Sequence, residues 1–387
     1  MLFSSLAVVA AATAALASPV KPSGKTVALP VKRSSNVKSA KSLVEKGHAR
    51  LNKINGVKTV GKRDSSGSVT NDDVSYIAAV TIGDGTYNLI VDTGSSNTWC
   101  GAQSSCEPSS TGQSTGQSVS VSYGSGSFSG TEYTDNVSFG GLTVQGQSVG
   151  AADQSSGFNG VDGIIGFGPV DLTQNTVSGS DSVPTFMDNL YSQGAISTEV
   201  LGVSFRPESG GDTDDTNGEL TLGGTDSSKY SGSITYFNTL QSGDAAPYWG
   251  ISIASFSYGS TTLASSATGI VDTGTTLIYI PTKAYNKFLS ATGGSTDSAS
   301  GLSSFPNKPT SNFNIKFGST TFSLTPSQYL VPSSQYSEFG LSSGQYYSFI
   351  NDGGSSGVDT IIGQKFLENY YSVFDTTNAR IGFAPAV

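Results

Sequence analysis

The sequence carries two copies of one short pattern that could bring a pair of carboxylates together. IVDTG occupies residues 90–94 and occurs again at 270–274. In each copy the apolar residues predict a buried strand that carries the aspartate to its end, and the glycine permits a tight turn around the carboxylate. A single Asp-Thr-Gly is typical of an ordinary turn. Two matched copies indicate two loops, each contributing one aspartate to a pair.

Two carboxylates about 3 Å apart cannot both ionise cheaply, so Asp92 and Asp272 would share one proton over an acidic range. The ionised member can activate a water held between them. The protonated member can polarise a carbonyl and later protonate the leaving nitrogen. The predicted chemistry is therefore general acid–base hydrolysis without a covalent intermediate.

Composition excludes several other chemistries. Residues 18–63 hold 12 of the 20 Lys and Arg residues and one of the 29 acids, which leaves 8 basic and 28 acidic residues after position 63. The single histidine, His48, also lies before position 63. The later part of the chain therefore lacks a histidine for a Ser-His-Asp system or a metal site, and its two cysteines are too few for a cysteine-based cluster. We expect no metal, no cofactor and no nucleic-acid partner.

The repeat continues downstream of each loop. Ile-Ile-Gly follows the first loop at 164–166 and the second at 361–363. Self-similarity on this scale indicates two homologous lobes, which we expect at 64–240, with Asp92, and at 241–387, with Asp272.

Short apolar runs separated by Gly, Ser, Asn and Asp predict a mainly β architecture with a few short helices. The expected helices lie at 183–194 and 282–290, and the Ser/Gly tracts at 103–119 and 292–304 are interpreted as loops. The expected strands lie at 74–83, 86–94, 218–224, 234–240 and 248–259.

The first 63 residues are interpreted as targeting and processing segments. Residues 1–17 are apolar and predict a secretory signal, although a buried N-terminal helix is the alternative. The basic segment 18–63 ends in Lys62-Arg63, which resembles a processing site, and a second dibasic pair stands at 32–33. It is either a disordered tail or a pro-segment that covers an acidic body, and residues 42–54 have helix-compatible spacing.

These residues together resemble the pepsin-like aspartic proteases, particularly secreted fungal enzymes of the polyporopepsin type. The resemblance covers essentially all of 64–387 and rests on five motifs. They are VDTGSSNTW (91–99), SYGSGSFSG (122–130), DGIIGFG (162–168), VDTGTT (271–276) and the C-terminal stretch 361–386.

The resemblance implies a bilobal β fold with a cleft between the lobes, and a catalytic dyad of Asp92 and Asp272. It implies a flap hairpin around Tyr123 that closes over substrate, with Trp99 packed nearby and hydrogen-bonded to the Tyr123 hydroxyl. The sequence does not indicate which pro-segment lysine, if any, approaches the dyad. Residues implied to support the dyad are Thr93, Gly94, Ser95, Thr273, Gly274 and Thr275, and those implied to shape the flap and substrate pockets are Gly124, Ser125, Gly126, Ile90, Ile164 and Ile270.

The resemblance also bears on smaller features. Cys100 and Cys106 match a small loop disulfide near the active site, which secretion permits. Ser125 stands where some fungal relatives carry an aspartate that helps accept lysine beside the cut. We therefore expect a preference for large apolar residues around the scissile bond and weak cleavage after lysine. Asn136 begins a short glycosylation motif, which is weak evidence.

The leading interpretation is a secreted acid endopeptidase made as a zymogen, with a vacuolar location as the alternative to an extracellular one. We expect a monomer that acts on extended polypeptides, is inhibited by its own pro-segment and by pepstatin-type compounds, and does not bind membranes. One alternative is a catalytically inactive relative that serves as a binding protein, although Asp92, Asp272 and Tyr123 are all present. The other is a secreted β-rich carbohydrate-binding protein, which would leave the paired loops unexplained.

Overall fold

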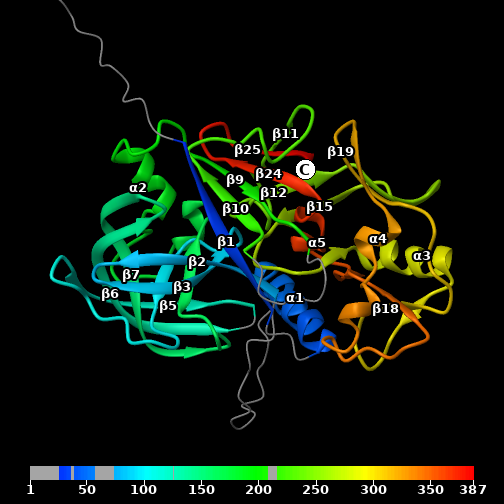
Figure 1. Cartoon of the computed structure of the whole chain (residues 1–387), viewed down its shortest axis with the longest axis horizontal. Helices are drawn as coiled ribbons and strands as arrows, with labels where there is room; N and C mark the ends of the chain where they lie inside the picture. Colours follow the sequence, from blue (N-terminus) through cyan, green and yellow to red (C-terminus); the bar gives the residue numbers. More distant parts are fainter. Residues whose placement is uncertain (1–25, 36–38, 57–73, 125, 208–215) are drawn as a thin grey trace, which may run out of the picture.

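The computed structural model describes residues 26–35, 39–56, 74–124, 126–207 and 216–387, and the described chain is mainly β. Figure 1 shows two halves: β2 to β7 with α2 on one side, and α3, α4 and β18 on the other. Strand β1 (Val27–Ser35) and helix α1 (Ala40–Ile54) run through the middle, between the halves. Both elements belong to the predicted pro-segment.

One sheet of 13 strands spans both halves, and β1 is an internal strand of it, pairing with β10 on one side and β2 on the other. The pro-segment is thus part of the framework of the molecule. In spatial order the sheet contains β11 (Thr235–Asn238), β25 (Arg380–Pro385), β24 (Tyr370–Asp375), β9 (Val200–Ser204), β10 (Gly218–Leu222), β1, β2 (Val74–Ile82), β3 (Gly85–Asp92), β8 (Gly163–Gly166), β4 (Thr98–Cys100), β7 (Leu142–Ser156), β6 (Ser127–Phe139) and β5 (Gln113–Ser122).

The second half adds three smaller sheets. The first contains β12 (Gly250–Ile253), β15 (Ala267–Val271), β23 (Thr360–Ile362), β16 (Ile278–Ile280) and β22 (Ile350–Asp352). The other two contain β14 (Thr261–Ala264), β13 (Ser255–Tyr258), β19 (Phe313–Phe317) and β20 (Thr320–Leu324), and β17 (Ser295–Thr296), β18 (Ser303–Phe305) and β21 (Tyr346–Ser348).

The longest helices of the described chain are α1 and α3 (Thr282–Thr292). The others are short: α2 (Phe186–Ser192), α4 (Pro326–Tyr329), α5 (Gln364–Leu367) and two 3-10 turns, Val170–Thr173 and Ser333–Gln335. Helices α1, α2 and α3 agree with the segments in which helices were expected. None of the helices that the structure describes has the length and apolarity to cross a bilayer.

The two halves repeat one local arrangement. In the first, β3 pairs in parallel with β8, so that Ile90 lies opposite Ile164. In the second, β15 pairs in parallel with β23, so that Ile270 lies opposite Ile361. The strand before each Asp-Thr-Gly loop therefore lies beside the Ile-Ile-Gly strand of the same half, so the repeat in the sequence corresponds to a repeat in the structure.

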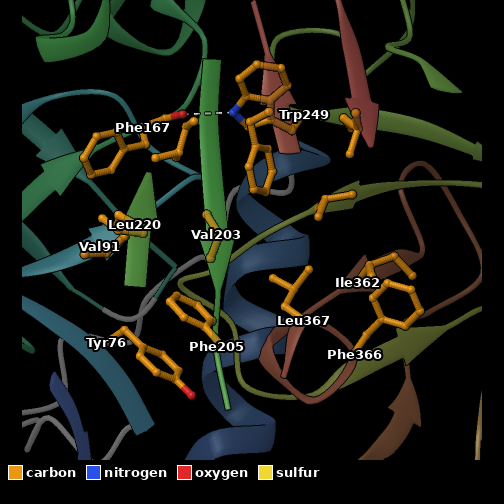
Figure 2. Close-up of a cluster of buried hydrophobic side chains, with 14 of the residues drawn as sticks. Tyr76, Val91, Phe167, Val203, Phe205, Leu220, Trp249, Ile362, Phe366 and Leu367 are labelled. Carbon is orange, nitrogen blue, oxygen red and sulfur yellow. Dashed lines mark hydrogen bonds between the residues drawn. The ribbon is translucent and has the colours of Figure 1, made fainter. Parts of the chain in front are cut away.

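The seam between the halves is filled by one cluster of buried apolar side chains (Figure 2). Trp249 Nε1 donates a hydrogen bond of 2.9 Å to the carbonyl oxygen of Phe167, joining the second half to the first. Burying a large apolar side chain contributes about 1.5–3 kcal/mol, so this seam fixes the halves against each other. Other members of the cluster are Tyr76, Val91, Val203, Phe205, Leu220, Ile362, Phe366 and Leu367.

Two loop predictions were wrong. The tract 103–119 contains the start of β5, and the tract 292–304 contains β17 and the start of β18. In β5, Val119 and Val121 alternate with serines and are buried, and backbone pairing with β6 supplies the hydrogen bonds. The predicted lobe boundary at 240/241 falls between β11 and β12.

Candidate active site

The two aspartates emerge from strand ends and meet between the halves. Asp92 is the last residue of β3, and Asp272 directly follows β15. Their side chains are 2% and 0% exposed. Each inner carboxylate oxygen (Oδ1) accepts a backbone N–H at 2.9 Å, from Gly94 for Asp92 and from Gly274 for Asp272. The glycine turn therefore wraps its carboxylate as the sequence predicts.

The outer oxygens are held by hydroxyl groups. Ser95 Oγ donates to Asp92 Oδ2 at 2.5 Å, and Thr275 Oγ1 donates to Asp272 Oδ2 at 2.6 Å. The two loops thus bind their carboxylates in the same way, with one backbone amide and one hydroxyl each. Hydrogen bonds of this kind favour the ionised form of a carboxyl group.

Each glycine also lies against the carboxylate of the other half. A Cβ atom on Gly94 would come within 2.6 Å of Asp272 Oδ1, and one on Gly274 would come within 2.4 Å of Asp92 Oδ1. Because Cβ atoms do not approach this closely, a side chain at either position would push the carboxylates apart. The loops are therefore complementary across the seam.

Arg50, from helix α1 of the predicted pro-segment, bridges the two aspartates. Its Nη2 donates to Asp92 Oδ1 at 2.7 Å and to Asp272 Oδ1 at 3.0 Å, and its Nε donates to Asp272 Oδ2 at 2.9 Å. One nitrogen atom thus contacts both inner oxygens, which places the carboxylates face to face. The basic residue at the pair is an arginine, whereas the sequence analysis considered only lysines.

The two carboxyl groups are electrostatically different while Arg50 is in place. Burial opposes ionisation of Asp92, but the Arg50 charge and the Ser95 and Gly94 hydrogen bonds outweigh it and hold the pKa below its usual value. For Asp272 burial prevails, helped by the neighbouring Asp92 charge, and the pKa is raised despite Arg50. The environment therefore pushes the two pKa values apart.

Helix α1 is seated by apolar packing on the second half. It begins after Ser39, whose side chain accepts a hydrogen bond from the Ser42 backbone, as an N-cap does. Tyr279 Oη, from β16, donates to the Val44 carbonyl at 3.0 Å. The buried face of the helix packs against Ile270 and its neighbours and consists of Ala40, Leu43, Val44, Gly47, Leu51 and Ile54.

The β5–β6 turn lies over α1. Tyr123 donates its backbone N–H to the Gly126 carbonyl at 2.7 Å, which closes the turn. A Cβ atom on Gly124 would come within 2.5 Å of the Arg50 backbone nitrogen, and the ammonium of Lys53 lies 5.3 Å from the centre of the Tyr123 ring. The expected flap therefore contacts the pro-segment helix directly.

Trp99 packs beside Tyr123 as expected, with the two rings stacked and their centroids 6.4 Å apart. Burial raises the pKa of Tyr123 well above its usual value, and the neighbouring Trp99 N–H opposes this rise. Among the described residues neither Trp99 Nε1 nor Tyr123 Oη has a partner with full hydrogen-bond geometry, so the hydrogen bond between them stays a prediction.

The expected pocket residues fall into two groups. Ile90 and Ile164 belong to one buried cluster with Trp99 and Tyr123. Ile270 belongs to the cluster that packs against α1. The structure thus brings the first group together beneath the flap and covers Ile270 with the pro-segment.

The remaining predicted residues lie away from the carboxylates or outside the described residues. A disulfide joins Cys100 to Cys106, as the resemblance implied. Asn136 is half-buried within β6, and its glycosylation stays a prediction. Ser125, the processing pair Lys62 and Arg63, and the signal segment 1–17 lie outside the described residues.

Comparisons with known proteins identify what the chain resembles. The family model described as eukaryotic aspartyl protease matches residues 75–386. Polyporopepsin from Irpex lacteus is 49% identical over 333 residues, covering 83% of this chain and 97% of the relative, and rhizopuspepsin from Rhizopus chinensis is 35% identical over 97% of both chains. A crystal structure of aspartic proteinase from Irpex lacteus matches with a TM-score of 0.79 and 42% identity, covering 94% of this chain and 98% of that one.

Proposed function

The chain belongs to the pepsin-like family of aspartyl proteases and is an aspartic endopeptidase, and from this premise we propose that it is secreted as a zymogen whose mature form uses Asp92 and Asp272 as the catalytic pair at acidic pH. The observation that carries the proposal is the single Arg50 nitrogen that contacts both inner carboxylate oxygens. A water molecule in that position would contact both carboxylates in the mature enzyme.

The reaction follows from a pair that shares one proton. The ionised carboxylate takes a proton from the water, whose oxygen attacks the peptide carbonyl carbon, while the protonated carboxyl donates a hydrogen bond to the carbonyl oxygen. The tetrahedral intermediate then collapses, the C–N bond breaks, and a carboxyl group gives its proton to the leaving nitrogen. We treat the two groups as one coupled pair, because the proton belongs to both.

The zymogen state is supported by what α1 does to this site. Arg50 satisfies both carboxylates with its charge and fills the position of the water, and the helix covers Ile270 in the predicted lobe 241–387. The depressed pKa of Asp92 means that its attraction to Arg50 is present above the usual aspartate pKa and is lost as pH falls through the depressed value. Because the pKa of Asp272 is raised, Asp272 gains a proton first as pH falls. Acidification therefore weakens the hold of Arg50, and we propose that cleavage after Lys62-Arg63 completes the release.

A preference for large apolar residues at the scissile bond is supported by the cluster beneath the flap. Ile90, Ile164 and Tyr123 are buried there with other aromatic side chains. A lysine side chain placed among these apolar groups would lose hydration.

The test is digestion of casein at about pH 3–5 by the secreted chain, with and without pepstatin or a chelator. We expect digestion that pepstatin blocks and the chelator does not. Asp92→Asn and Asp272→Asn should each lower the rate by at least about 10²–10⁴-fold, because one ionisable partner is lost. Thermal unfolding of both variants verifies that they fold. Digestion by either folded variant at the wild-type rate would overturn the proposal.

A further inference from the structure

We propose that the substrate cleft selects a basic residue, lysine or arginine, on one side of the scissile bond, through the carboxylates of Asp171 and Asp244. This inference rests on the proposed function, because it assigns a substrate class to the same cleft. It differs from the apolar preference at the scissile bond, which concerns the cluster beneath the flap.

The first observation is a large cavity beside the catalytic loop. Its volume is about 540 Å³, and its wall includes Gly94 and Ser95 of the Asp92 loop, Ser120–Ser122 of the flap strand β5, and Tyr248 of the other half. It therefore opens beside the Asp92 loop and lies between the halves, where an extended substrate would leave the catalytic pair. It remains open with the pro-segment helix in place.

The second observation is the charge on the wall of this cavity. Asp171, in the 3-10 turn Val170–Thr173, and Asp244, in the connection between β11 and β12, both line it, and both are exposed. One comes from each side of the seam. Asp171 also lines two further cavities, of about 260 and 120 Å³, which continue along the seam past Trp249. Asp171 thus lines all three cavities, and Asp244 lines the one that begins beside the Asp92 loop.

The third observation is that a basic residue of this chain, Lys53, lines the large cavity. Among the described residues that line the three cavities, the only cation is Lys53, at the end of α1. Lys53 follows Arg50 by three positions, about one helical turn. Lys53 lies at the wall of the cavity, with its ammonium 5.3 Å from the centre of the Tyr123 ring. Arg50 and Lys53 would both leave with the predicted pro-segment, and the mature cleft would then keep the two carboxylates without this cation.

Other acidic residues near this path are already engaged or uncharged at acidic pH. Asp188 accepts the Thr185 backbone N–H at 2.7 Å and so caps α2. Burial and the neighbouring Asp188 raise the pKa of Glu199 to about 8, so that Glu199 is protonated when the enzyme acts. Asp171 accepts one hydrogen bond of 3.3 Å at Oδ1, from the Gln174 side chain, and is exposed like Asp244, so both carboxylates can meet a substrate charge.

The test uses the processed wild-type enzyme at about pH 5. Peptides with large apolar residues on both sides of the scissile bond carry either lysine or glutamine at the second, third or fourth position on one side. We expect kcat/KM to be about threefold to tenfold higher for lysine at one or two positions, all on the same side, and added salt to reduce the ratio. Asp171→Asn and Asp244→Asn should each lower the ratio, and the double variant should bring it near one. Asp84→Asn removes an exposed carboxylate from the β2–β3 turn and serves as the matched control, with an unchanged ratio.

The outcomes separate this inference from the proposed function. If the wild-type enzyme cleaves the glutamine peptides but shows no lysine preference at any position, the inference is wrong and the proposed function stands. A lysine preference that persists in the double variant also overturns it. If the wild-type enzyme cleaves no peptide of either kind, the proposed function itself fails.

Discussion

Thr93 and Thr273 exchange hydrogen bonds across the seam between the halves. The Thr93 hydroxyl accepts the Thr273 backbone N–H at 3.0 Å, and the Thr273 hydroxyl accepts the Thr93 backbone N–H at 2.9 Å. Each hydroxyl also donates to a carbonyl of the other half, Thr93 to Val271 at 3.3 Å and Thr273 to Val91 at 2.9 Å. Four buried hydrogen bonds therefore set the position of one aspartate loop relative to the other.

Replacing Thr273 with valine should loosen this connection. Thr273→Val keeps the shape but leaves the Thr93 N–H and the Val91 carbonyl without their partner, at a cost of about 1–3 kcal/mol for each buried group. We expect a lower unfolding temperature and a lower kcat in the processed enzyme, measured by calorimetry and by peptide hydrolysis. Thr273→Ser retains the hydroxyl and is the control. A valine variant that matches the serine variant in both measurements would contradict the role assigned to these bonds.

Removing the Arg50 charge should allow activation at higher pH. In Arg50→Gln the two carboxylates lose their shared cation, so the pro-segment should leave the cleft with less acidification. We expect the pH of half-maximal processing of the full chain to rise by at least about one unit, measured by gel electrophoresis after incubation across a pH series.

Lys41 offers a matched control on the same helix. Its side chain is 61% exposed and lies 3.9 Å from Glu45, away from the aspartates. Lys41→Gln should leave the pH of half-maximal processing unchanged. An equal shift in both variants would mean that general helix charge, rather than the contact of Arg50 with the aspartates, governs activation.

Glu132 should make the protein less stable as the pH approaches neutrality. It is 3% exposed in β6, and burial raises its pKa from 4.5 to about 7 despite a hydrogen bond from Ser148. Between about pH 4.5 and 7 the folded state therefore keeps a proton on Glu132 that the unfolded state releases. The stability that this proton contributes is complete below about pH 4.5 and is lost as the pH rises toward 7. The loss amounts to about 3 kcal/mol.

Urea unfolding of Glu132→Gln tests this assignment. The variant should lose less stability than the wild type between about pH 4.5 and 7, because glutamine does not ionise. Glu107→Gln changes an exposed glutamate and should follow the wild-type curve. Parallel curves for all three proteins would show that Glu132 does not govern the pH dependence.

The dibasic pair at 32–33 should resist processing in the folded zymogen. Arg33 is fully buried in β1, which pairs with a strand on each side, and its Nε lies 4.0 Å from Glu368 Oε1. A dibasic-specific protease acting on the native chain should therefore cut after Arg63 and spare Arg33, as judged by mass spectrometry of the products. Unfolding in urea before digestion should expose both sites. Rapid cleavage after Arg33 in the native chain would show that β1 opens easily.

The sequence predicted the parts of this molecule that depend on short-range patterns. The paired Asp-Thr-Gly loops and helix α1 have local signals of apolar spacing and turn residues. The repeated Ile-Ile-Gly segments indicated two lobes, but their pairing beside the aspartate strands was seen only in the structure. Strand β5 was missed because only Val119 and Val121 mark its buried face among serines. The pairing of β5 with β6 stabilises the strand, and a local sequence pattern does not show such pairing.

The contact of Arg50 with the aspartates could not be predicted for a different reason. The pro-segment contains 12 basic residues, and which one reaches the pair depends on how α1 packs on Tyr279 and Ile270, far away in the sequence. The contact of the Lys53 ammonium with the Tyr123 ring has a similar origin, because it also depends on where α1 packs.

Because β1 is an internal strand of the sheet, its removal should affect how long the activated enzyme stays folded. Cutting after Arg63 would take away a strand whose backbone groups satisfy both β2 and β10, and two interior edges of the sheet would lose their partner at once. The shortened polypeptide then no longer contains every strand around which the original molecule was assembled. We therefore expect that, once thermally inactivated, it does not recover on cooling, so that its working lifetime is set by how slowly it opens.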